Sequence, residues 1–165
     1  MSRGMIPPGD RALGCLPFLL PLSASVVYGA SFFAQVPVLA VPFLPFFWLY
    51  GNILSFPVVP FLGISGEFVI FAGLYLLVVR GAGLPLFVRF NAMQAILIQI
   101  ALFIGQIITE VVATALGSPL LLQTLSNTLF MGVFTVCGLA IYECCVGRFA
   151  EIPSISQAAM TQCER

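Results

Sequence analysis

The chain has 165 residues, of which 61% are hydrophobic and only 7% are charged, against roughly 25% charged in an ordinary soluble domain. A soluble chain of this length could not bury so much apolar surface, so the composition predicts an all-α membrane protein without a soluble catalytic domain. The net charge is zero and all six basic residues are arginines, which excludes a nucleic-acid-binding surface.

The reactive side chains are few. The chain has no histidine and no lysine, and Asp10 is its only aspartate, so histidine-based triads, Schiff-base lysines and paired aspartates are excluded. Five cysteines lack CxxC spacing, so we expect no metal, no cofactor and no enzyme activity. Cys144 and Cys145 are adjacent at a predicted helix end, where they are either small packing residues or oxidisable or lipidated thiols.

Four stretches are long and apolar enough to cross a membrane, at about 13–33, 64–79, 92–116 and 121–146. A short segment, 1–12, precedes them without the pattern of a signal or transit peptide. We therefore predict one four-helix transmembrane domain over 13–148 and a tail over 149–165. Gly-rich and Pro-containing breaks at 80–85 and 117–119 separate the last three spans.

Residues 34–62 join the first two predicted spans and contain five prolines among clustered aromatic residues. Prolines at this density disfavour one straight helix, and clustered aromatic rings favour the headgroup level of a membrane. We predict a broken, interfacial segment here. A fifth span at about 38–50 is the alternative.

The arginines favour four spans. With four, both termini and the loop at 80–89 share one side, and every arginine lies there: Arg3, Arg11, Arg80, Arg89, Arg148 and Arg165. A fifth span would separate them. The positive-inside rule thus predicts both termini on the side of synthesis, the cytosol or stroma.

Residues 89–99 join this basic loop to the third predicted helix. Polar side chains in a membrane helix need a partner or a wet cavity, so Arg89, Asn91, Gln94 and Gln99 are candidate functional residues. Arg80 and Arg89 are equally candidates for anchoring the loop ends at lipid headgroups.

Further along the third helix, Gln99, Gln106 and Glu110 lie within about 40° of one another on a helical wheel. Such a stripe either bonds neighbouring helices or lines a polar path, and spacing alone favours helix contact. On the fourth helix, Asn127 is the candidate partner, because nearby threonines can bond their own backbone.

Several runs resemble the Tic20 family, the twenty-kilodalton subunit of the protein translocon of the inner chloroplast envelope, which has cyanobacterial relatives. The most specific is RFNAMQAIL at 89–97, preceded by VVR at 78–80. LPFLLPL at 16–22, NTLF at 127–130 and the tail with Ile152, Pro153, Ser156, Ala158, Ala159 and Gln162 extend the similarity over nearly the whole chain.

The resemblance implies four membrane helices with both ends in the stroma, and a core subunit contributing to a protein-conducting path. Implied partners are other translocon subunits, transiting preproteins, membrane lipid and further copies of the chain. Many relatives carry aspartate at the positions of Gln99 and Gln157. A structural or assembly subunit, and a small solute or ion channel, are the alternative functions.

Overall fold

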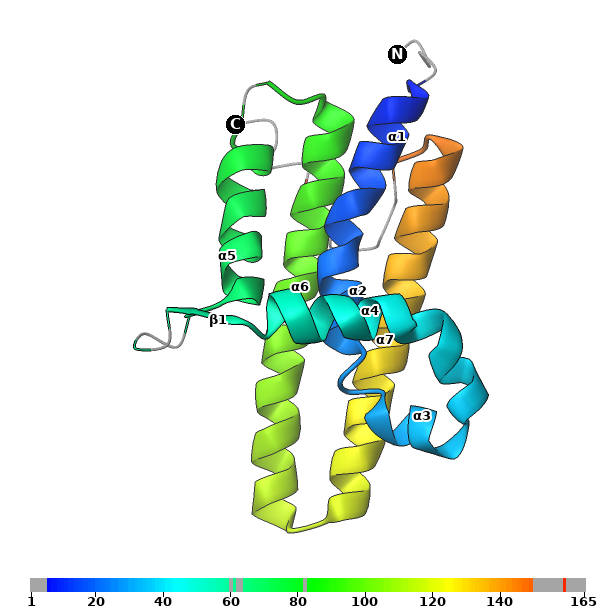
Figure 1. Ribbon diagram of the computed structural model, residues 1–165, viewed down its shortest axis with the longest axis vertical. Coiled ribbons are helices and arrows are strands. Elements are labelled where there is room, and N and C mark those ends of the chain that lie inside the picture. The colour runs from blue at the N-terminus through cyan, green and yellow to red at the C-terminus, as the bar shows by residue number, and fades with distance from the viewer. Residues whose placement is uncertain (1–5, 60, 62–63, 82, 150–158, 160–165) are drawn as a thin grey trace.

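The computed structural model describes residues 6–59, 61, 64–81, 83–149 and 159. Most of these residues are helical, as predicted. Several helices run side by side, and one helical run crosses them (Figure 1). The N-terminal segment 1–5 and most of the predicted tail, including Gln157, lie outside the described residues.

The chain begins with one bent helical run: α1 (Pro8–Cys15), η1 (Leu16–Phe18) and α2 (Leu19–Ser25). The tighter η1 turn contains Pro17, which has no N–H for the helical ladder. The prediction of one helix over 13–33 is wrong, because the run starts at Pro8 and stops at Ser25. A turn follows, and α3 (Ala30–Gln35) continues in another direction (Figure 1).

Packing causes this break. Val26 is fully buried, and a Cβ on Gly29 would lie 2.9 Å from the ring of Phe130. The rings of Phe33 and Phe130 are 5.2 Å apart. The chain therefore turns where its backbone meets an aromatic ring of another helix.

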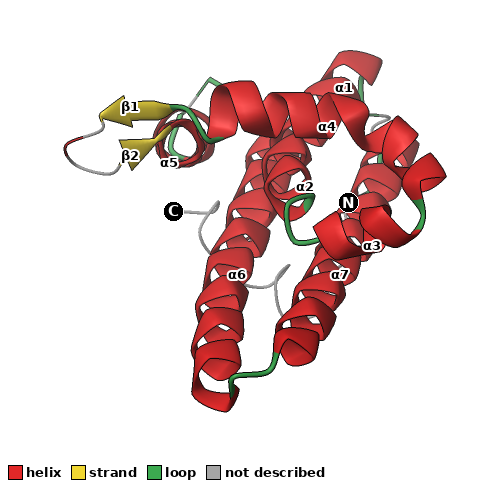
Figure 2. Cartoon of the chain, turned by 60° about the horizontal axis from the view of Figure 1, so that its bottom comes forward, coloured by secondary structure: helices red, strands yellow, loops and turns green. Residues whose placement is uncertain are grey.

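The proline-rich segment forms a crossing run of three helical pieces: η2 (Pro37–Phe43), α4 (Leu44–Leu49) and η3 (Tyr50–Leu54). The run lies across the long helices in both views (Figures 1 and 2). Leu54 is its single buried residue. A small antiparallel pair follows, β1 (Pro57–Val59) and β2 (Ile64–Ser65).

The remaining helices are α5 (Gly66–Gly73) with η5 (Leu74–Val79), then α6 (Leu86–Leu116) and α7 (Pro119–Val146). Gly117 adopts a positive φ of 58° and Pro119 is in the first turn of α7, which confirms the predicted break. At 31 residues, α6 is about 46 Å long. It begins six residues earlier than predicted, directly after Pro85.

Within the described residues, three helical runs are long and apolar enough to cross a membrane: Pro37–Leu54, Leu86–Leu116 and Pro119–Val146. The α5–η5 run, Gly66–Val79, is apolar but shorter.

Most of the core lies in one part of the molecule, which we call the packed half: α1, α2, α5, η5 and the adjoining residues 86–102 and 130–146. Here α1 and α2 lie between α6 and α7. Buried residues on α7 recur at helical spacing: Phe130, Val133, Cys137, Ala140 and Cys144. Residues 103–129, which we call the hairpin tip, extend beyond the crossing run (Figure 1) and contain one buried residue, Thr109.

Candidate functional site

The arginines of the described chain gather at one end of the bundle. The start of α1, the end of η5, the start of α6 and the end of α7 lie together there (Figure 1). Arg89 Nε donates to the carbonyl of Val79 at 2.8 Å, which ties the start of α6 to the end of η5. Arg11 Nη1 donates to the carbonyl of Cys145 at 3.4 Å, and Arg80 is exposed.

The first turns of α6 bury two amides. Asn91 is fully buried; its Nδ2 donates to the carbonyl of Phe87 at 3.0 Å and to Cys144 Sγ at 3.6 Å. Its Oδ1 has no hydrogen-bond partner among the described residues. Gln94, one turn further along, is also fully buried. These residues face the interior rather than an open mouth.

The central polar contact joins α5 to α6. Gln99, fully buried, donates through Nε2 to Glu67 Oε1 at 2.6 Å. Gln99 Oε1 has no partner within the described chain, and neither does Ser23 Oγ, which is buried in α2. The predicted stripe thus contains a buried hydrogen bond, with unpaired acceptor oxygens in an apolar interior.

The rest of the stripe lies elsewhere. Gln106 Nε2 donates to Glu110 Oε1 at 3.0 Å, within one helix, on the exposed surface of the hairpin tip. Asn127 on α7 is half-buried, and its Oδ1 has no partner in the described part of the chain. The structure therefore separates Gln99 from Gln106 and Glu110: Gln99 is fully buried, Gln106 is half-buried and Glu110 is exposed.

Three threonines on α7 bond their own backbone, as the sequence indicated. Their hydroxyls donate to carbonyls four residues earlier at 2.8 Å: Thr124 to Leu120, Thr128 to Thr124, and Thr135 to Met131. They offer no hydrogen bond across helices in this arrangement.

Two site residues were not identified from the sequence. They are Glu67, in the first turn of α5, and Ser23, in α2. A carboxyl group in the first turn of an apolar helix is itself a signal, because it needs a donor nearby. Which donor it finds depends on packing that the sequence pattern does not contain.

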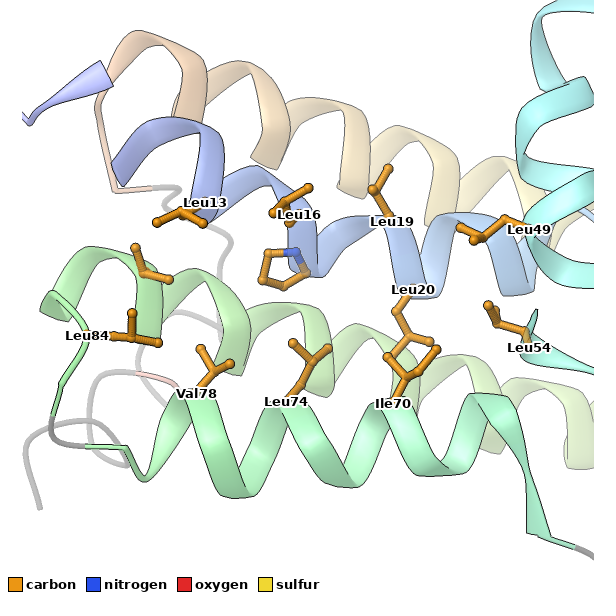
Figure 3. A pocket seen from close by; sticks show the side chains of 12 residues that line it. Leu13, Leu16, Leu19, Leu20, Leu49, Leu54, Ile70, Leu74, Val78 and Leu84 are labelled. Carbon is orange, nitrogen blue, oxygen red and sulfur yellow. The ribbon is translucent and has the colours of Figure 1, made fainter. Parts of the chain in front are cut away.

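An apolar cavity of about 270 Å³ lies between the α1–α2 run and α5–η5. Figure 3 shows leucine and isoleucine side chains from both sides pointing into it, with Leu49 and Leu54 at one end. This lining suits hydrocarbon, such as a lipid chain or an apolar side chain, and has no place for a solvated ion.

The fold and the site define a class: a helical protein with long apolar helices and a few buried amides and a carboxyl group between them. The profile described as "Chloroplast import apparatus Tic20-like" matches residues 10–159. The chain belongs to this Tic20 family, which confirms the resemblance seen in the sequence.

Similar proteins come from a cyanobacterium and from plants. A Tic20 family protein of Synechocystis is 37% identical over 93% of this chain and 92% of its own length. Protein TIC 20-II, chloroplastic, of Arabidopsis thaliana is 29% identical over 94% and 73%. Protein TIC 20, chloroplastic, of Pisum sativum is 28% identical over 92% and 58%. At family level, these matches support a role in chloroplast protein import and a chloroplast membrane location.

Proposed function

We propose that this chain is a core, non-enzymatic membrane subunit of the preprotein translocon of the inner chloroplast envelope, or of the corresponding cyanobacterial membrane. Membership of the import-apparatus family carries the proposal. The partners would be other translocon subunits, transiting preproteins, surrounding lipid and further copies of the chain.

The proposed topology has four spans, with both termini on the stromal side. The α1–α2 run, the α5–η5 run, α6 and α7 are the spans, and the crossing run lies at an interface. Support comes from the gathering of Arg11, Arg80 and Arg89 at one end of the bundle. The exposed Trp48 and the nearby rings of the crossing run also favour an interfacial position.

The path would use the buried acceptors of the packed half. Ser23 Oγ, Asn91 Oδ1 and Gln99 Oε1 are buried without donors within the described chain. In an apolar interior, a hydrogen bond to such an oxygen is stabilising, because the unpaired oxygen is costly to bury. An extended preprotein carries backbone N–H groups, so these acceptors would bind it transiently once the helices separate.

Site-specific photocrosslinking tests this proposal. A crosslinking amino acid replaces Gln99, Gln106 or Glu110 in turn, and an arrested preprotein occupies the complex. We expect capture from Gln99, because the bundle must open there, and none from Leu139, which is 60% exposed on α7. A path along this face would be refuted if none of the three positions captures preprotein while the Leu139 control labels lipid.

A structural or assembly subunit is the second candidate, because the Gln99–Glu67 hydrogen bond joins two helices and could serve packing alone. Replacing both residues by leucine separates the two functions. If the double variant fails to assemble into the complex, the buried polar pair serves assembly; if it assembles and still imports preprotein, the pair is not part of the path. If it assembles and import stops, the pair belongs to the path.

A further inference from the structure

Three thiols meet where the first and last helices come together. A Cβ on Gly14 would lie 2.9 Å from Cys144 Sγ, so α1 and α7 approach closely at this glycine. Cys15 is the last residue of α1, and Cys145 is the penultimate residue of α7. Their Sγ atoms are 3.8 Å apart, although 130 residues separate them in the chain.

The three thiols differ in access. Cys145 is exposed, Cys15 is half-buried, and Cys144 is buried. Cys144 is held by two contacts: its Sγ lies 3.3 Å from the carbonyl oxygen of Arg11 and accepts from Asn91 Nδ2. Cys145 is therefore a solvent-accessible thiol, and the less exposed thiol of Cys15 lies in contact with it.

We propose that Cys15 and Cys145 form a redox-active dithiol, a modification site that is oxidised by an external disulfide. Closing the present sulfur separation to a bond of about 2.05 Å needs a small rotation of the side chains, with both helices in place. Such a pair on the stromal or cytosolic side would be formed and broken by exchange, because structural disulfides are rare in reducing compartments.

The chemistry is thiol–disulfide exchange. The Cys145 thiolate attacks one sulfur of the external disulfide and releases its other half as a thiolate. The Cys15 thiolate then attacks the Cys145 sulfur of the mixed disulfide and releases the second half. The external disulfide gains two electrons and the two protons of the cysteine thiols, and the chain gains one Cys15–Cys145 bond.

The disulfide would fix α1 to the end of α7. Arg11, one turn before Cys15, already donates to the carbonyl of Cys145. The bond would make this contact covalent, so that α1 could leave α7 only after reduction.

The test uses the full chain in membrane-like discs, with oxidised glutathione as the probe. After an acid quench, free thiols are alkylated and peptides are mapped without reduction. We expect one linked pair, Cys15 with Cys145, and the loss of two free thiols per chain. Cys15→Ser should leave a lasting glutathione adduct on Cys145, because the second step is lost, whereas the matched control Cys144→Ser should still form the linked pair.

Wild-type mapping decides the matter even if a variant does not fold. The proposal is overturned if wild-type protein accumulates glutathione adducts without the linked peptide. It is equally overturned if Cys145 links to Cys163 or to a second copy of the chain, or if every thiol remains free.

Discussion

The packed half and the hairpin tip are built from the same two helices, yet only the packed half is covered. Residues 86–102 of α6 include 12 buried residues, whereas residues 103–129 include one. The tip is no less apolar: Ile104, Ile107 and Val111 are all more than half exposed. What differs is the α1–α2 run, which ends before it reaches the tip (Figure 1). The hydrophobicity of a helix therefore indicates that its surface must be shielded from water. Whether the protein itself shields that surface depends on where its other helices lie.

The largest effect is expected from placing a charge on the tip. Ile104 is 53% exposed on an apolar surface, and arginine in the middle of a membrane helix costs about 2.5–3.5 kcal/mol of insertion free energy. Ile104→Arg should reduce insertion of the α6–α7 hairpin, measured with glycosylation reporters at its ends. Gln106→Arg, two residues away, is the control. It replaces a residue that is already polar, so it should reduce insertion less than Ile104→Arg. Equal insertion of wild-type and Ile104→Arg protein would mean that lipid does not cover the tip.

Next in size is the contrast between two glutamines on one helix. Gln99→Leu leaves the Glu67 carboxyl group without its donor and should lower the free energy of unfolding in detergent by about 1–3 kcal/mol. Gln106→Leu removes an exposed contact within the helix and should change it by less than about 0.5 kcal/mol.

The double variant of Glu67 and Gln99 to leucine sharpens this contrast, because it removes both polar groups and leaves neither unpaired. The free energy of unfolding of this double variant should therefore be closer to the wild-type value than that of Gln99→Leu. If the two single glutamine variants lose equal stability, the packed half and the tip do not differ as described.

A difference of similar size is expected between two glycines. A Cβ on Gly14 would meet Cys144, Phe87 and Asn91 at about 3 Å, and all three are buried. Gly14→Ala should therefore destabilise the protein by about 1–3 kcal/mol in thermal unfolding. The three atoms nearest to a Cβ on Gly105 would all belong to Leu129, a half-buried side chain that can move.

Because alanine is a better helix former than glycine by up to about 1 kcal/mol, Gly105→Ala should leave stability unchanged or raise it slightly. A loss as large as that of Gly14→Ala would show that the tip is packed as tightly as the rest.

The sequence predicted the parts of the fold that depend on local signals. The turn at Gly117 with Pro119 ends α6 and starts α7 within a few residues of the predicted boundaries, because glycine and proline act through their own backbone. The break after Ser25 was not predicted, because its cause is contact with Phe130, more than a hundred residues away.

The candidate site shows the same limit. Helical periodicity placed Gln99, Gln106 and Glu110 on one face of α6. Neighbouring helices pack against only part of that face, so its residues differ in burial. Gln99 lies under α5 and pairs with Glu67, whereas Gln106 lies beyond that cover. Only the position of the neighbouring helices distinguishes the fully buried Gln99 from the half-buried Gln106.

The central claim is that this chain works within a protein-import complex, and isolation of the native complex with an arrested preprotein tests it most directly. Under mild detergent, we expect the chain to copurify with other translocon subunits and with the preprotein. Recovery of the chain alone, or with unrelated solute transporters, would contradict the claim.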